Sequence, residues 1–180
     1  MHADPAPPAY DPRRPIVLIG LMGAGKSTVG RRLAYRLRLP FVDSDREIEA
    51  AAGLTIAEMF ARYGEAQFRD GERRVIARLI DGRPKVIATG GGAFMQPETR
   101  ALILDRATAI WLDADIDVLA ERVARRTGTR PLLAGGNPRE TLADLARVRN
   151  PVYALAPIHI RSRPLPHEAT VDEIMKILHP

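Results

Sequence analysis

The chain has 180 residues, of which 46% are hydrophobic, and it contains no cysteine. This length suits one globular domain with a substantial core, and the lack of cysteine excludes disulfides and thiolate metal sites. Lys and Arg number 27 against 22 Asp and Glu, a net charge of +5. The basic pairs are dispersed and no aromatic residues interleave with them, which favours an anionic small ligand over nucleic acid. The apolar runs are too short to span a membrane.

The chain begins with a Pro-rich stretch over residues 1–14, which we predict to be a disordered tail without a secretory signal. From residue 15 to 180, strand-length apolar runs alternate with helical patterns, which predicts a single α/β domain with a mostly parallel sheet covered on both faces. Strands are expected at Ile16–Ile19, Pro40–Val42, Lys85–Ala88, Thr108–Leu112 and Ile158–Ile160. Helices are expected at Lys26–Arg38, Asp45–Ala52, Ile56–Arg62, Glu65–Ile80, Pro97–Asp105, Ile116–Arg126, Arg139–Tyr153 and His167–Leu178. The Gly/Pro-dense stretch Thr127–Pro138 predicts a mobile loop.

A glycine-rich motif, GLMGAGKST, follows the first predicted strand and opens the first predicted helix. It matches the phosphate-loop pattern at Gly20, Gly25, Lys26 and Ser27 in the context that supports such a match. In such a loop, backbone N–H groups surround phosphate oxygens, the lysine reaches the β and γ phosphates, and the hydroxyl can ligate Mg²⁺. A plain glycine-rich turn would need neither the lysine nor the hydroxyl.

Two aspartates, Asp43 and Asp45, follow the second predicted strand. Residues two apart on an extended chain face the same side, so both carboxylates could face a ligand at the carboxyl edge of the sheet. One would help to hold Mg²⁺, and the other would accept a hydrogen bond or proton from a substrate hydroxyl. The alternative is helix capping by Ser44 or Asp45, with a helix that begins near Arg46.

Three glycines, Gly90, Gly91 and Gly92, follow the third predicted strand, where no carboxylate stands. Glycines at the end of a buried strand leave the backbone open to a ligand. A flexible turn into the next helix is the alternative.

Arginines supply the remaining candidates for a site. Arg69 lies four residues after Glu65 and three before Glu72, so the three share a helix face. This pattern is often a surface ion pair, but an arginine can also bind a carboxylate with two hydrogen bonds. Arg130 could move over a transferring phosphoryl group, and Arg149 could lie either on the surface or in the site.

The chain resembles the shikimate kinase family in its motifs and in their order. The matching pieces are GLMGAGKST, DSD, GEAQFR with Glu72 three residues on, GGGA, RPLL and RNPVY, and they span Gly20 to Tyr153. The phosphate loop alone is widespread, whereas the combination is specific. The resemblance implies a three-layer P-loop fold of the nucleoside-monophosphate-kinase type with five parallel strands. It also implies transfer of the ATP γ-phosphate to the 3-hydroxyl of shikimate, with Mg²⁺, by a cytoplasmic monomer in aromatic amino acid biosynthesis.

The resemblance also implies roles for single residues. Lys26, Asp45 and Arg130 would be catalytic, and Ser27 and Asp43 would hold the metal, the latter through water. Glu72 would orient Arg69, an acceptor-binding region would cover about 44–72, and a lid about 127–139. The implied ATP-binding residues are Gly23, Ala24, Gly25, Lys26, Ser27, Thr28, Arg126 and Arg130. The implied shikimate-binding residues are Asp45, Arg69, Gly91 and Arg149.

Some positions depart from the family pattern. The first half of the lid, residues 127–129, is shorter than in many members. Family members often carry an adenine-side arginine late in the chain; the matching place here falls near Pro166, and substitution by Arg161 or Arg163 is a conjecture. One alternative function is another small-molecule kinase of this fold, for gluconate or a nucleoside monophosphate. Another is a non-catalytic nucleotide switch or nucleic-acid-binding protein, which would need neither the paired aspartates nor the lid arginine.

Overall fold

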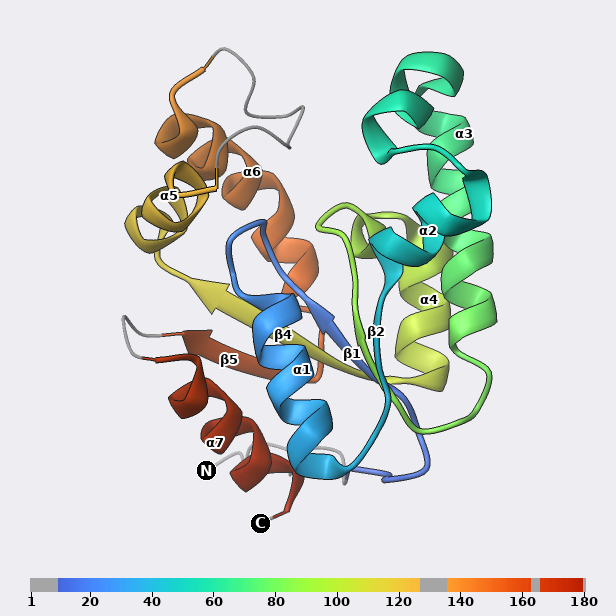
Figure 1. The fold of residues 1–180 in the computed structure, drawn as a ribbon. Helices are drawn as coiled ribbons and strands as arrows, with labels where there is room; N and C mark the ends of the chain where they lie inside the picture. The colour runs from blue at the N-terminus through green and yellow to red at the C-terminus, as the bar shows by residue number, and fades with distance from the viewer. Residues whose placement is uncertain (1–9, 127–135, 163–165, 180) are drawn as a thin grey trace, which may run out of the picture.

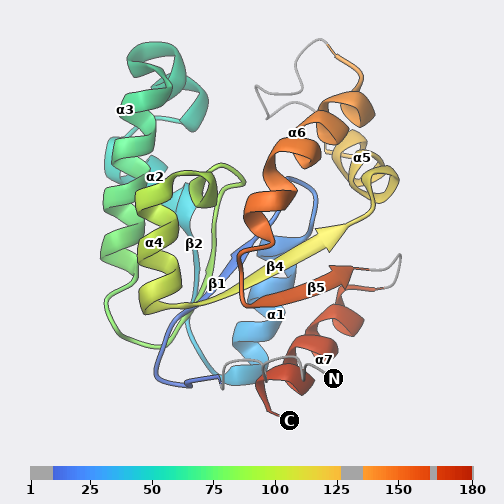
Figure 2. The same ribbon diagram turned by 180° about the vertical axis from the view of Figure 1, so that it is seen from behind.

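A parallel five-stranded sheet of order β2-β3-β1-β4-β5 organises the part of the chain that the computed structural model describes, residues 10–126, 136–162 and 166–179. The strands are β1 (Ile16–Ile19), β2 (Phe41–Asp43), β3 (Val86–Ala88), β4 (Thr108–Ala114) and β5 (Ile158–Ser162). The helices are α1 (Lys26–Leu37), α2 (Ser44–Ala52), α3 (Ile56–Leu79), the 3-10 helix η1 (Ala93–Met95), α4 (Pro97–Arg106), α5 (Ile116–Ala124), α6 (Pro138–Tyr153) and α7 (His167–Leu178). Figures 1 and 2 show α1 and α7 on one face of the sheet and α4 and α6 on the other. The predicted three-layer α/β/α fold is confirmed.

The predicted boundaries hold to within a few residues. β2 takes in Asp43, β4 continues to Ala114 and β5 to Ser162, while α6 already begins at Pro138. The two helices expected on either side of Gly64 form α3, and Gly64 lies at a kink with a non-helical φ of 78° and ψ of 173°. The rest of the predicted loop after α5, residues 127–135, lies outside the described residues.

Strand burial follows strand position in the sheet. β1 pairs with β3 on one side and β4 on the other, and all four of its residues are buried. A central parallel strand is covered on both faces, which is why its sequence is an unbroken apolar run. In β5, at the edge, buried Ile158, Ile160 and Ser162 alternate with exposed residues. The core is therefore centred on β1, β3 and β4.

Local signals place the ends of several helices. At the start of α3, Thr55 and Glu58 form a capping box, because each side chain accepts a hydrogen bond from the other residue's backbone N–H, at 3.2 Å and 2.7 Å. Pro97 and Pro138 are the first residues of α4 and α6, positions where proline costs no hydrogen bond.

Two pairs of helices stand beyond the carboxyl edge of the sheet. α2 packs with α3 on one side and α5 with α6 on the other, and the loop after β1 lies between the two pairs (Figure 1). This is the edge at which open parallel sheets bind ligands. The fold therefore brings the predicted functional segments to one place.

The described chain begins at Tyr10, before the predicted domain start at residue 15. The Tyr10 ring packs edge-on against His179 near the other terminus, with centroids 5.8 Å apart. Residues 1–9 of the predicted tail lie outside the described residues. Among the residues that are described, no helix is both long and apolar enough to cross a membrane.

Candidate active site

The phosphate loop connects β1 to α1 and leaves the first turn of α1 without a side-chain cap. Gly25 is the N-cap residue with φ of 89°, a left-handed conformation that glycine adopts at low cost. The first N–H groups of a helix have no partner within the helix, and together with the helix dipole they favour an anion. Ala24 is buried and Thr28 is half-buried, so Ala24 can offer a phosphate little more than its backbone.

Lys26 lies over the loop that precedes it. Its ammonium group donates hydrogen bonds to the carbonyl oxygens of Gly20 at 2.7 Å and Leu21 at 2.9 Å. The charge is thus held at the mouth of the loop, next to the backbone that would surround a phosphate.

Ser27 and Asp43 meet although they are 16 residues apart. The Ser27 hydroxyl donates to Asp43 Oδ2 at 2.9 Å, and Asp43 Oδ1 accepts from the backbone N–H of Asp45 at 3.0 Å. A side chain does cap this helix, but it is that of Asp43 and not that of Ser44 or Asp45. The helix begins at Ser44, one residue before the predicted Asp45 and two before the Arg46 of the capping alternative.

These two oxygens fit a magnesium site. Mg²⁺ prefers oxygen ligands and is commonly bound by one or two carboxylates together with substrate phosphates and water. A hydroxyl and a carboxylate side by side, next to a phosphate loop, meet that requirement. The described residues contain no cluster of three or more His, Cys, Asp or Glu that could hold a metal by themselves.

The triple glycine after β3 is fixed next to the phosphate loop. Its preceding residue, Thr89, donates from both its backbone N–H, at 3.2 Å, and its hydroxyl, at 3.0 Å, to the carbonyl oxygen of Leu18 in β1. β2 and β3 pair in parallel, with Asp43 opposite Ala88. The aspartates and the glycines therefore leave neighbouring strands at the same edge.

Each of the three glycines makes room for a different predicted site residue. A methyl group on Gly90 would lie 2.8 Å from Asp45 Oδ1, and one on Gly91 would lie 2.8 Å from an Arg149 guanidinium nitrogen. One on Gly92 would overlap the guanidinium of Arg69. The close approach of these side chains thus depends on the missing β-carbons. Sequence reasoning assigned Gly91 as a ligand-facing backbone and missed this steric role of all three.

Arg69 is held by a buried carboxylate and two rings. Its Nη1 donates to Glu72 Oε1 at 2.8 Å, and the rings of Phe68 and Phe60 lie 5.2 Å and 5.8 Å from its guanidinium carbon. Glu72 is only 1% exposed. Burial raises the pKa of Glu72, while the charge of Arg69 partly offsets that effect. The predicted orienting contact between the two is present, so this ion pair is internal.

One nitrogen of the Arg69 guanidinium has no hydrogen-bond acceptor among the described residues. This Nε is buried, and the carboxylate of Glu65 lies 3.6 Å from it. Leaving such a donor unpaired is costly.

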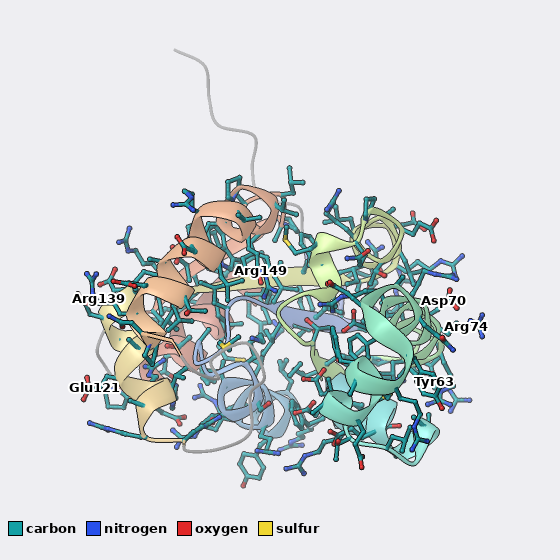
Figure 3. All side chains as sticks on the ribbon, turned by 90° about the horizontal axis from the view of Figure 1, so that it is seen from above. Tyr63, Asp70, Arg74, Glu121, Arg139 and Arg149 are labelled. Atoms are coloured by element: carbon teal, nitrogen blue, oxygen red, sulfur yellow. The ribbon has the colours of Figure 1, made fainter. Side chains whose placement is uncertain are left out.

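Arg149 projects from α6 toward the centre of the molecule. In Figure 3 it lies between the two helix pairs, whereas Glu121 and Arg139 lie on the outer side of α5 and α6. Tyr63, Asp70 and Arg74 are likewise on the outer side of α3. The sequence left undecided whether Arg149 lies on the surface or in the site. The structure places it in the site, next to Gly91.

Two basic residues near the phosphate loop escaped sequence reasoning. Arg122, on α5, donates to the carbonyl oxygen of Gly23 at 3.2 Å, and burial lowers its pKa. The His167 ring packs on Gly25, where a methyl group would lie 2.7 Å from its Cε1. Burial, and next the charge of Arg122, lowers the pKa of His167, which favours a neutral ring at the loop.

The arginines expected to lie near an adenine are only partly among the described residues. Arg126 is exposed just after α5, while Arg130 and Arg163 lie outside the described residues. Arg161 pairs with Asp115 at 3.1 Å, with both side chains more than half exposed. An adenine contact by Arg161 would therefore compete with its ion pair to Asp115.

Transfer of a phosphoryl group between two small molecules requires a loop that binds the nucleotide phosphates and a second site for the acceptor. Here the arginines and aspartates that face the phosphate loop can form the second site. The fold and this arrangement place the chain in the class of P-loop kinases with a small-molecule acceptor.

The chain belongs to the shikimate kinase family. A family model described as "Shikimate kinase" matches residues 22–179. The shikimate kinase of Zymomonas mobilis is 59% identical over 165 residues, covering 92% of this chain and 93% of that protein. The one from Novosphingobium aromaticivorans is 58% identical over 169 residues, covering 92% and 87%.

Solved structures agree with this assignment. The shikimate kinase of Acinetobacter baumannii, in complex with shikimate, has a TM-score of 0.87 at 37% identity, and the match covers 92% of each chain. A gluconokinase from Sinorhizobium meliloti has a TM-score of 0.60 at 20% identity over 93% of this chain and 92% of that one. The second likeness indicates a shared fold alone.

Proposed function

We propose that this chain transfers the γ-phosphoryl group of ATP to the 3-hydroxyl of shikimate, at the site formed by the phosphate loop and the triple glycine. The observation that carries the proposal is the meeting of Asp45, Arg69 and Arg149 on three consecutive glycines, in a member of the shikimate kinase family. A gluconate or nucleoside monophosphate kinase is not favoured, because its only support is a fold likeness at low identity.

On the nucleotide side, the backbone of residues 23–28 surrounds the phosphates at the N-terminus of α1. Lys26 moves from the carbonyl oxygens of Gly20 and Leu21 to the β and γ phosphate oxygens, which are stronger acceptors because they are charged. Arg126 packs at the adenine, and Arg130 compensates charge on the transferring group.

Ser27 and Asp43 would hold Mg²⁺, Asp43 through water. Their oxygens already meet at 2.9 Å. Bound there, the ion neutralises phosphate charge.

On the acceptor side, Arg69 and Arg149 bind the carboxylate of shikimate. Two guanidinium groups around one carboxylate make charge-assisted hydrogen bonds, about twice as strong as neutral ones. Both guanidinium groups lie against the glycine backbone, so a ligand between them also contacts Gly91. This fixes the ring of shikimate with its hydroxyls toward Asp45.

Asp45 orients the acceptor hydroxyl and takes its proton. The hydroxyl oxygen then forms a bond to the γ-phosphorus, the bond from that phosphorus to the bridging oxygen breaks, and ADP leaves with the electron pair. Such a reaction depends mostly on positioning and charge compensation. The rigid placement of Asp45 by the first turn of α2 serves that need.

We further propose that residues 44–72 form the acceptor-binding region and 127–139 a lid, and that the enzyme is a cytoplasmic monomer. Lid closure would exclude water, which otherwise competes with shikimate for the phosphoryl group.

An assay that couples ADP release to NADH oxidation tests the function. We expect shikimate to stimulate ADP release from Mg-ATP, while gluconate and nucleoside monophosphates at the same concentration do not. Stimulation by one of those acceptors in place of shikimate would refute the proposal.

A further inference from the structure

Two side chains of α6 contact the same glycine of the triple-glycine segment. Arg149 and Tyr153 are four residues apart, so they share a helix face, and both reach Gly91. A methyl group on Gly91 would lie 2.8 Å from the Arg149 guanidinium and 3.5 Å from the Tyr153 hydroxyl. The hydroxyl itself donates to the carbonyl oxygen of Gly91 at 2.5 Å. The residues in this contact are 62 apart in the chain.

Tyr153 is fully buried, with 0% of it exposed. Its ring packs near Trp111 of β4, with ring centroids 6.0 Å apart. This packing of the ring does not require the hydroxyl. Burial raises the pKa of Tyr153, partly offset by the charge of Arg149 and by a side-chain hydrogen bond with Arg149. The hydroxyl therefore remains a hydrogen-bond donor at the pH of ordinary assays.

The hydrogen bond acts on the orientation of a peptide group. The described residues contain no cis peptide bond, and in a trans peptide the carbonyl and the following N–H point in opposite directions. Fixing the carbonyl of Gly91 therefore fixes the direction of the Gly92 N–H, away from Tyr153. Turn hydrogen bonds from the Ala93 N–H to the Gly90 carbonyl oxygen, at 3.3 Å, and from the Met95 N–H to the Gly92 carbonyl oxygen, at 3.2 Å, flank this peptide. The hydroxyl adds a constraint on the Gly91 carbonyl itself, in a segment where glycine allows several backbone conformations.

We propose that Tyr153 is a positioning residue for the acceptor site, whose hydroxyl holds the Gly91–Gly92 peptide in the orientation that shikimate binding requires. This inference rests on the proposed function. Arg149 then contacts a loop of fixed shape, and so do Asp45 and Arg69, which pack on the flanking glycines. The tyrosine acts through the loop and through its contact with Arg149, and it touches neither substrate.

The test is Tyr153→Phe, which removes the hydroxyl and keeps the ring. The loss of one hydrogen bond to a buried carbonyl predicts a rise of about three- to tenfold in the KM for shikimate. The KM for ATP should change less than twofold, because the phosphate loop is held by hydrogen bonds of its own, from the Ala24 N–H to the Leu21 carbonyl oxygen at 3.1 Å and from the Val29 N–H to the Gly25 carbonyl oxygen at 2.8 Å. Isothermal titration with shikimate in the absence of ATP should show the same loss of affinity.

Two controls separate positioning from general destabilisation. Tyr35→Phe makes the same chemical change on an 85% exposed tyrosine of α1 and should alter neither KM. Ile174→Val removes one methyl group from a fully buried residue of α7 and should lower the melting temperature with both KM values unchanged.

A double-mutant cycle with Arg149→Lys adds a second test. If the tyrosine acts through the loop that Arg149 contacts, its removal should raise the shikimate KM less in the Arg149→Lys background than in the wild type. Full additivity would overturn the proposal. So would a Tyr153→Phe enzyme that melts earlier but binds shikimate normally, or one in which both KM values rise equally. Wild-type enzyme that ignores shikimate would instead refute the proposed function, and the positioning role with it.

Discussion

A single added methyl group at Gly92 should impair shikimate binding, because it displaces the guanidinium of Arg69. Gly92 has φ of −89° and ψ of −12°, which alanine adopts without strain. The new β-carbon would overlap Nη2 of Arg69 and lie 2.6 Å from both Cζ and Nη1. Because the guanidinium is the far end of a flexible side chain, it moves before the backbone does.

The size of the effect follows from what Arg69 loses. Hydrogen bonds to charged groups contribute about 1.5–3 kcal/mol, and each 1.4 kcal/mol corresponds to about tenfold in affinity. Gly92→Ala should therefore raise the KM for shikimate about 10- to 100-fold. The KM for ATP should stay within about twofold, because the displaced side chain faces the acceptor.

Initial-rate kinetics with each substrate varied in turn, alongside thermal melting, measure these effects. Gly71→Ala is the matched control, on the same helix as Arg69, with nothing within 4 Å of the added carbon. It should stabilise the protein by about 0.5–1 kcal/mol, since glycine inside a helix is unfavourable. It should leave both KM values unchanged. A Gly92→Ala enzyme with normal shikimate KM would refute the steric argument.

Two further predictions concern ionisable groups. Asp45→Asn should lower kcat by about 10²- to 10⁴-fold, the usual contribution of a general base, with a much smaller change in either KM. Stopped assays with radiolabelled ATP can measure kcat. A loss of kcat under fivefold would mean that Asp45 serves only in binding. The pKa of His167 is lowered from 6.5 by burial and by Arg122, Arg32 and Arg126, so below pH 6.5 the unfolded chain binds a proton that the native protein does not. The free energy of unfolding should therefore fall as the pH drops through 6.5 toward the native pKa. Urea titrations measure this free energy at pH 5 and at pH 7.5, and its difference between the two pH values should be smaller in His167→Gln than in the wild type. The same difference in both proteins would contradict this assignment.

Much of the fold was accessible to sequence reasoning because the signals are local. The apolar run of β1, the left-handed glycine before α1 and the capping box of α3 each involve residues within a few positions of one another. Even the break in α3 was indicated by Gly64. The errors were at ends, such as the start of α2, where Asp43 caps the helix and takes the place expected for Ser44 or Asp45.

The sequence by itself determined that this chain has a phosphate loop, two aspartates, a triple glycine and several arginines, and it determined the family through their order. Only the tertiary structure decided which of these groups meet. Asp43 reaches Ser27 across 16 residues, and Tyr153 reaches Gly91 across 62. Such contacts depend on how parallel strands pair and how helices pack above their ends. Hydrophobic periodicity and short motifs carry no information on these distances, so the steric role of the glycines became visible only when Arg69, Asp45 and Arg149 had positions in space.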